Sequence, residues 1–331
     1  MVRFSWRPRA QLRLPSLAIY FFALLIVGRV IYDIAGIGLL SPFSGNLPHV
    51  HLQAAHHNLT ATSHSDCSTG VLYRNACVSR FPVSSARRVE AVVAGIIFNM
   101  SVYSTGGEIE DIVSNNIAQH RVWEKTETEE MMGLFPCIQG AHCEEGGYFI
   151  NRRGTLLDVG ANIGWYSLVA AHIGHNVISF EPFSKNVDLL CSSQRDLKED
   201  FKNNWKLFQM GLDYRKRQCQ LFQVKGINFG DTHSVCDEKT RESFLINKYE
   251  PLGWMNTTTL DDALLAGVFD SYSGIDVMKI DVEGFEPSVF AGANRFFESK
   301  YAPRYIFIEF NVLPGEAGDY SKSTLIHLRN H

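Results

Sequence analysis

The fold is decided by the stretch LLDVGANIGWY at residues 156–166, which is followed one helix later by VISFEP at residues 177–182. Each stretch begins as an apolar strand; the first ends in an acid and a glycine, and the second ends in Glu181. In an open α/β sheet, ligands bind beyond the carboxyl ends of the strands, next to a glycine turn and a helix N-terminus. Gly160 and Gly164 permit such a turn. The pattern therefore predicts an adenosine-binding site in which Glu181 accepts hydrogen bonds from a ribose diol.

The composition of the turn decides which adenosine compound fits. A dinucleotide site has the pattern G-x-G-x-x-G, with the pyrophosphate at the helix N-terminus. Residues 158–164 read DVGANIG instead and hold two glycines. Asp158, at the end of the strand, would repel a pyrophosphate but suits the ammonium of a methionyl group. We therefore expect S-adenosylmethionine, and a nicotinamide-dependent sugar enzyme is the weakest of three alternatives.

Strand and helix patterns alternate along most of the chain beyond residue 91. Such alternation predicts a doubly wound, mostly parallel α/β sheet with helices on both faces. Strands are expected at 91–103, 155–159, 176–180, 206–210, 218–224, 276–280 and 305–310, and helices at 111–135, 163–173, 184–201, 260–266 and 286–298.

A group of acids follows the strand predicted at 276–280, in the stretch MKIDVEGFE at residues 278–286. Asp281 and Glu283 would lie beside the place of the transferred methyl group, whereas Glu286 falls in a helix first turn, where acids stabilise the helix dipole. A hydroxyl acceptor must lose a proton, which a carboxylate or a histidine can take. Asp281 is the first candidate for the general base or acceptor-orienting group, and His233 is the second.

The stretches DVGANIG, ISFEP, TTLDDAL, MKIDVEGFE and IFIEFN, with WEKTET upstream, together resemble the FkbM family of methyltransferases over residues 91–311. The resemblance implies a class I methyltransferase sheet of the Rossmann type, S-adenosylmethionine as cofactor, and O-methylation of a hydroxyl on a sugar, polyketide or related small molecule.

The resemblance also implies roles for individual residues, and the cysteine spacing gives no reason to expect a metal site. Asp281 would lie at the mouth of the substrate site, and Glu283 belongs to the D-V-E-G turn. The cofactor-binding residues would be Asp158, Gly160, Ala161, Asn162 and Gly164 for the methionyl and ribose region, Glu181 for the ribose, and residues 211–213, ending in Asp213, for the adenine.

The C-terminal end departs from the expected pattern. A class I sheet usually adds a helix and an antiparallel hairpin after its fifth strand, but residues 312–330 show at most one short helix, at 323–328. We therefore expect the last two strands to be missing and the fifth strand to have an unpaired edge. This favours, as an alternative function, an inactive relative that binds without catalysis.

The first forty residues predict a membrane anchor. Arginines precede an apolar run at residues 17–40, which Arg29 interrupts, and no further lysine or arginine follows until Arg74. The positive-inside bias predicts a cytosolic tail at 1–16 and a single-pass type II protein facing the Golgi or endoplasmic reticulum lumen. A flexible stem at 41–90 would lead to the domain at 91–331. A cleaved signal peptide is the alternative. Sequons at Asn58, Asn99 and Asn256 suit such a lumen.

The net charge and the cysteine pattern exclude some kinds of partner and suggest disulfide candidates. The net charge is −4 and no basic stripe is present, which argues against nucleic acid. The seven cysteines contain no C-x-x-C pair, and histidines scattered in the stem are expected to be solvated. In an oxidising lumen, Cys67–Cys77 and Cys137–Cys143 are the disulfide candidates. The expected partners are the membrane, through residues 17–40, and a glycan or small-molecule acceptor.

Overall fold

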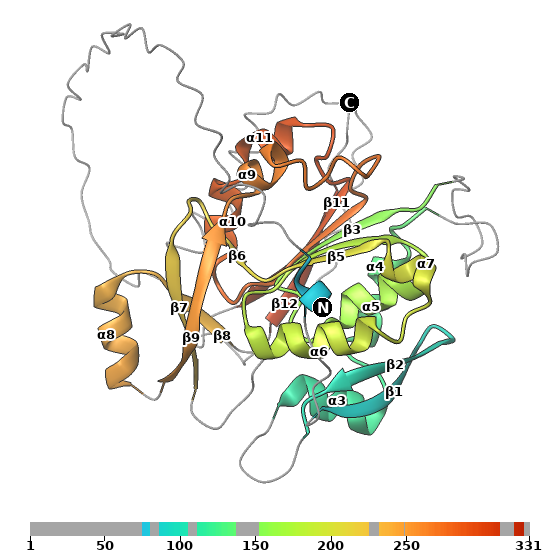
Figure 1. The fold of residues 1–331 in the computed structure, drawn as a ribbon, viewed down its shortest axis with the longest axis horizontal. Coiled ribbons are helices and arrows are strands. Elements are labelled where there is room, and N and C mark those ends of the chain that lie inside the picture. Colours follow the sequence, from blue (N-terminus) through green and yellow to red (C-terminus); the bar gives the residue numbers. More distant parts are fainter. Residues whose placement is uncertain are drawn as a thin grey trace, which may run out of the picture. The chain divides into compact units, whose positions relative to one another are not determined.

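A six-stranded sheet in the order β12-β11-β10-β3-β4-β5 forms the centre of the fold (Figure 1). The computed structural model describes residues 75–79, 86–104, 111–136, 152–224, 232–247, 249–311 and 321–327. The strands are β3 (Thr155–Val159), β4 (Asn176–Phe180), β5 (Trp205–Phe208), β10 (Val277–Ile280), β11 (Tyr305–Asn311) and β12 (Ser321–His327). All pairs are parallel except β11 with β12. The chain reverses its direction of winding between β3 and β10, which makes this boundary the topological switch point.

Helices cover both faces of this sheet, as expected (Figure 1). One face carries α5 (Trp165–His172), α6 (Ser184–Gln194) and α7 (Glu199–Lys202), and the other carries α9 (Leu260–Leu265), α10 (Glu286–Ala291) and α11 (Asn294–Glu298). Successive strand residues enter opposite cores: Leu156 packs in the first and Leu157 in the second. This alternation explains why the strand is apolar at both positions.

A hairpin and two short helices precede the sheet. β1 (Arg87–Val93) and β2 (Ile96–Val102) pair antiparallel, and β2 contacts α6 through a hydrogen bond from the Ser101 amide to Ser193 Oγ at 2.8 Å. The single helix expected at 111–135 is wrong, since the chain forms α3 (Ile112–His120) and α4 (Lys125–Met132). Arg121 and Glu124, with positive φ angles of 64° and 38°, interrupt the helical backbone between them.

A second sheet, in the order β6-β9-β7-β8, was largely missed by the sequence patterns. It consists of β6 (Gly211–Leu212), β7 (Gln218–Val224), β8 (Thr232–Val235) and β9 (Tyr249–Thr258), with α8 (Glu238–Ile246) in the connection between β8 and β9. Only β7 was expected. Pro251 and Gly253 interrupt the alternation of β9, and the register shifts opposite Leu221. Proline and glycine within a strand weaken its sequence signature.

The expectation that the fifth strand has an unpaired edge is wrong. β12 pairs antiparallel with β11 along its whole length, from Tyr305 opposite His327 to Asn311 opposite Ser321. The segment expected as a short helix at 323–328 is mostly strand. Its two β-branched residues, Thr324 and Ile326, favour an extended backbone, and pairing with β11 satisfies the backbone groups that a helix would have satisfied internally.

The folded unit includes residues ahead of the boundary expected at Ala91. The 3-10 helix η1 (Ala76–Ser79) is tied to α6 by a disulfide between Cys77 and Cys191, and β1 begins at Arg87. The pairing of Cys77 with Cys67 is therefore wrong. The second disulfide joins Cys219 and Cys236, and the candidate pair Cys137–Cys143 lies outside the described residues.

The predicted membrane helix at residues 17–40 also lies outside the described residues. Within the described ranges, none of the helices has the length and apolar character needed to cross a bilayer.

A buried carboxylate joins three strands at the amino end of the sheet. Asp276 accepts hydrogen bonds from both terminal nitrogens of Arg152, at 2.9 and 2.6 Å, and from the Thr155 amide at 3.0 Å. Its backbone groups bond to Thr155 in β3 and to Tyr305 in β11. The carboxylate is thus fully paired although it is buried, as buried charges must be.

We expect Asp276→Ala to lower the free energy of unfolding by about 3 kcal/mol, because it leaves a guanidinium and a buried amide without their acceptor. Denaturant unfolding of the full chain measures this loss. The control is Glu199→Gln, which removes an exposed ion pair with Lys202 and should change the free energy of unfolding by less than about 1 kcal/mol. Equal losses in the two variants would contradict the role of Asp276.

Candidate functional site

A pocket lies at the carboxyl ends of β3, β4 and β10, at the switch point of the sheet. The first wall comes from the ends of these strands and contains Gly160, Glu181 and Asp281. The opposite wall comes from the second sheet and contains Thr232, Ser234 and Met255. The pocket therefore lies between the strand ends that the sequence predicts and strands β8 and β9, which the sequence did not predict.

The two glycines of the turn are required by packing. Both have positive φ angles, 79° at Gly160 and 92° at Gly164. A Cβ atom at Gly160 would collide with the carbonyl oxygen of Asp281, and one at Gly164 would collide with Leu190 in α6. Of the two, only Gly160 lines the pocket. Ala161 is buried and lies outside the lining, so neither it nor Gly164 is placed as a direct cofactor contact.

Asn162 and Glu181 meet at the pocket, as the sequence predicts. The backbone N–H of Asn162 donates to Glu181 Oε2 at 2.8 Å, and the backbone N–H of Phe183 donates to Glu181 Oε1 at 2.8 Å. Asn162 has a left-handed backbone with a φ angle of 51°, and its buried Oδ1 has no hydrogen-bond partner. An unsatisfied buried acceptor in a pocket wall is suited to a ligand donor.

Burial raises the pKa of Glu181 to about 7, and the hydrogen bonds from Phe183, Asn162 and Asn186 only partly oppose this effect. The carboxyl group is therefore half protonated near neutral pH. An ionised carboxylate is an acceptor only, whereas a protonated one also carries a donor. The protonation state of Glu181 thus decides whether the group is an acceptor only or also a donor.

Asp158 is placed differently from its prediction. Its side chain is 1% exposed, does not line the pocket, and accepts a hydrogen bond from Ser167 Oγ at 2.6 Å. Burial raises its pKa, while Lys279, its neighbour in the paired strand β10, lowers it. Asp158 therefore lies beneath the pocket and does not face a ligand directly.

Asp281 lines the pocket and forms an ion pair with Lys279, whose Nζ lies 3.0 Å from Asp281 Oδ2. Lys279 is almost fully buried, and the carboxylates of Asp281 and Asp158 hold its pKa above the usual value despite this burial. The sequence reasoning missed Lys279, although it stands in the quoted stretch MKIDVEGFE. Its position in an apolar strand that Asp276 and Asp281 flank was the signal.

A second polar pair adjoins this one and was also missed. Tyr166, in the first turn of α5, donates its hydroxyl hydrogen bond to Glu124, and Lys279 Nζ lies 5.2 Å from the centre of the Tyr166 ring. Burial raises the pKa of Glu124, and Lys279 lowers it. The segment WEKTET thus connects through Glu124, at the start of α4, and Tyr166 to Lys279, the partner of Asp281.

The remaining acids after β10 have distinct surroundings. Glu283 lines the pocket with a left-handed backbone, at a φ angle of 52°. Glu286 accepts hydrogen bonds from the amides of Val282, at 3.0 Å, and Gly284, at 3.3 Å. Its structural role is confirmed, because it fixes the turn that presents Asp281 and Glu283.

His233 does not reach the pocket, which corrects its assignment as a second base. Thr232 and Ser234 line the pocket, and strand alternation directs His233 to the opposite face of β8. There its ring packs against Phe244 and Tyr249, with centroid separations of 5.9 and 5.4 Å.

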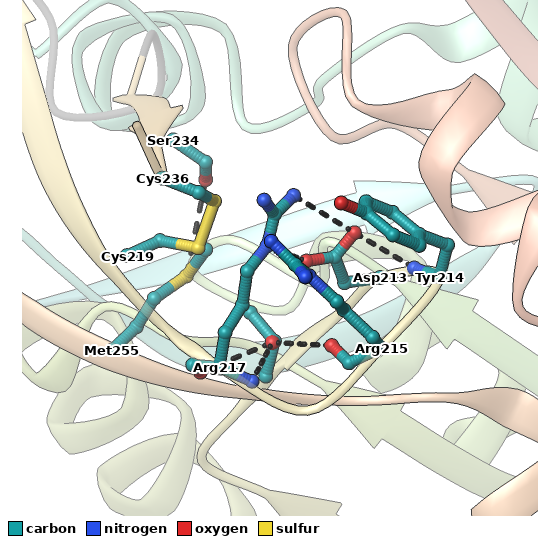
Figure 2. The surroundings of a disulfide bond; sticks show 9 residues. Asp213, Tyr214, Arg215, Arg217, Cys219, Ser234, Cys236 and Met255 are labelled. Atoms are coloured by element: carbon teal, nitrogen blue, oxygen red, sulfur yellow. Dashed lines mark hydrogen bonds and ion pairs between the residues drawn. A yellow bond between two sulfur atoms is a disulfide. The ribbon is translucent and has the colours of Figure 1, made fainter. Parts of the chain in front are cut away.

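Asp213 is likewise directed away from the pocket. Gly211 and Leu212, two of the three residues predicted to lie near an adenine, line the pocket, but the Asp213 carboxylate is paired with the Arg217 side chain (Figure 2). Asp213 also forms, with Cys219 and Cys236, the one group of potential metal ligands among the described residues. The two sulfur atoms of that group are joined in a disulfide.

Comparisons with solved structures find methyltransferases at low similarity. A SAM-dependent methyltransferase from Agrobacterium tumefaciens matches with a TM-score of 0.34 and 8% identity, covering 71% of this chain and 56% of that one. A putative SAM-dependent methyltransferase from Streptococcus mutans matches with a TM-score of 0.28 and 13% identity, covering 70% and 43%. Precorrin-6y C5,15-methyltransferase from Geobacter metallireducens matches with a TM-score of 0.24 and 11% identity, covering 50% and 57%.

This chain thus spans between 43% and 57% of the length of these structures. No protein of curated function matches at a significant level. The family model of the methyltransferase FkbM domain matches residues 158–331, which is just over half of the 331 residues. That range begins at Asp158 and includes the glycine turn, Glu181 and the acids that follow β10. The chain therefore belongs to the FkbM methyltransferase family.

Proposed function

We propose that this chain is an S-adenosylmethionine-dependent O-methyltransferase that acts on a hydroxyl of a glycan or small molecule in the secretory lumen. The observation that carries the proposal is the pocket in which the glycine turn of β3, Glu181 at the end of β4 and Asp281 at the end of β10 come together.

The residues of the pocket fit this cofactor. Glu181 is placed to accept hydrogen bonds from the ribose diol, and the unsatisfied Asn162 Oδ1 offers a further acceptor. Met210, Leu212 and Phe285 supply apolar surface for a flat base. When bound, S-adenosylmethionine supplies a methyl group on a positively charged sulfonium.

The charges near the pocket also favour a cationic ligand over a pyrophosphate. The described residues of the pocket lining include the carboxylates of Asp281 and Glu283 and no lysine or arginine, and Lys279, the cation beside Asp281, is shared with the buried Asp158. This favours S-adenosylmethionine over NAD, whose pyrophosphate would meet that charge. The pairing also keeps Asp281 at the pocket wall, where it orients an acceptor hydroxyl and takes its proton.

The lumenal location is supported by the cysteines and the sequons. Two disulfides join Cys77 to Cys191 and Cys219 to Cys236, and such bonds persist in oxidising compartments. Asn99 and Asn256 are exposed on their strands, where a glycan meets no steric obstacle from the core. Together with the anchor expected at residues 17–40, these features favour a type II protein with its domain in the Golgi or endoplasmic reticulum lumen.

A non-catalytic binding protein of the same fold is the second candidate. It is favoured by the ion pair of Asp281, which occupies one oxygen of the best-placed base, and by the absence of His233 from the pocket lining. Calorimetry of the full chain with S-adenosylmethionine and then with NAD tests the cofactor. Transfer of a radiolabelled methyl group to a panel of glycans and small hydroxylated acceptors separates the enzyme from the binding protein.

Cofactor affinity should rise with pH up to about 7 and level off above it. The pKa of Glu181 is near 4.3 in an unfolded chain and about 7 in the fold. The free energy of unfolding therefore falls as the pH rises between these two values, because the buried carboxyl group must ionise. Binding of a diol favours the ionised form and therefore releases a proton. From pH 8 to 5.5 the ionised fraction of a group with a pKa of about 7 falls about thirtyfold, so we expect a loss of S-adenosylmethionine affinity of roughly tenfold to thirtyfold, measured by calorimetry.

Glu181→Gln should weaken binding and remove this pH dependence, because the amide does not titrate in this range. Glu242→Gln, on the exposed surface of α8, removes the same charge elsewhere and should leave both affinity and pH dependence unchanged. A pH dependence that persists in Glu181→Gln would show that another group controls it.

Asp281→Asn should leave S-adenosylmethionine affinity within about threefold of the wild-type value and reduce methyl transfer by roughly 10²-fold or more, as expected on removal of a general base. Affinity is measured by calorimetry and turnover by transfer of the radiolabelled methyl group. Turnover equal to that of the wild type would reject Asp281 as the base.

A further inference from the structure

The pocket wall formed by β8 has little support from the strands around it. Thr232 and Ser234 line this wall. β8 has four residues and, within the described residues, pairs only with β7, from Gln220 opposite Val235 to Gln223 opposite Thr232. A short antiparallel pairing of this kind is marginally stable by itself.

A disulfide fastens the end of this strand. Cys236 directly follows Val235, and Cys219 directly precedes Gln220, so the two cysteines extend the register of the β7–β8 pair by one position. Figure 2 shows the disulfide beside Ser234 and Met255. Because Cys236 is two residues from Ser234, the covalent link ties the C-terminal end of β8 to β7 close to the part of the strand that lines the pocket.

The buried end of the disulfide packs directly behind the pocket. Cys219 is fully buried in a small cluster with Phe183, Leu221 and Met255. Met255 lines the pocket, and its sulfur accepts a hydrogen bond from Ser234 Oγ at 3.8 Å. The same cluster thus joins the disulfide, β9 and Ser234, the residue of β8 that lines the pocket and bonds to Met255.

We propose that the Cys219–Cys236 disulfide is a positioning element of the cofactor pocket, which holds Thr232 and Ser234 in the wall before S-adenosylmethionine binds. Without it, β8 spends more time detached from β7, and the binding-competent fraction of the protein falls. The apparent dissociation constant rises by the inverse of that fraction. This inference rests on the proposed cofactor, and it assigns a function in binding to a bond that would otherwise serve stability alone.

The second disulfide of the chain provides a matched control. Cys77–Cys191 joins η1 to α6, and neither cysteine lines the pocket. Its sequence separation is 114 residues, against 17 for Cys219–Cys236. Closing the longer loop restricts the unfolded chain more, so its loss should cost more stability. We therefore expect the loss of Cys77–Cys191 to lower stability more, and the loss of Cys219–Cys236 to lower cofactor affinity more.

The experiment compares the full-length wild type with the double variants C219A/C236A and C77A/C191A. Hydrogen exchange of the free proteins reports on residues 232–235, and calorimetry reports the affinity for S-adenosylmethionine. We expect C219A/C236A to exchange faster at β8 and to bind roughly tenfold more weakly. C77A/C191A should lower the melting temperature further, yet keep wild-type exchange at β8 and wild-type affinity.

Each alternative outcome has a separate meaning. Unchanged exchange at residues 232–235 in C219A/C236A, or equal losses of affinity in the two double variants, would overturn the proposal. Exchange measurements do not require a ligand. If the wild type binds no S-adenosylmethionine, the proposed function fails, while faster exchange confined to β8 in C219A/C236A still supports the positioning of this strand by the disulfide.

Discussion

The contact between the turn after β3 and the backbone that leaves β10 is the constraint on which the rest of the structure depends. Gly160 lies so close to the Asp281 carbonyl that no side chain fits between them, and the Asp281 amide donates to the Val159 carbonyl at 3.0 Å. This contact closes the switch point of the sheet. It places the turn that carries Asn162 next to the turn that carries Glu283, so the distance between these two parts of the pocket lining is fixed.

The same contact explains how the acids of the site differ in role. Asp158 and Lys279 are partners across β3 and β10, within the sheet, whereas Asp281 lies one step beyond the last paired residue. Asp158 is therefore buried, with one carboxylate oxygen bonded to Ser167, while Asp281 remains at the pocket wall. Lys279 interacts with both carboxylates, the buried Asp158 and the pocket-lining Asp281, and so couples their charges.

The opposite wall of the pocket has a different origin and a different kind of support. It comes from the small sheet, in which β9 and β7 are long but irregular and β8 is short. Apolar packing around Met255 and the Cys219–Cys236 disulfide hold this wall in place. The main sheet fixes its side of the pocket through backbone contacts, and the second sheet fixes the other side through side chains and a covalent bond.

The sequence by itself determined the alternation of strands and helices, the glycine turn and the placement of Asn162 and Glu181 at one site, because these depend on local periodicity and on chain geometry that every parallel sheet shares. It predicted neither β8 and β9 nor the pairing of β12, because their residues acquire a strand conformation only from the partner strands. It also could not place Asp158, Asp213 or His233, since burial and the choice of ion-pair partner are set by groups distant in sequence. Tertiary structure alone decided which carboxylates face the pocket, because a side chain on a strand or turn is directed by what packs against it.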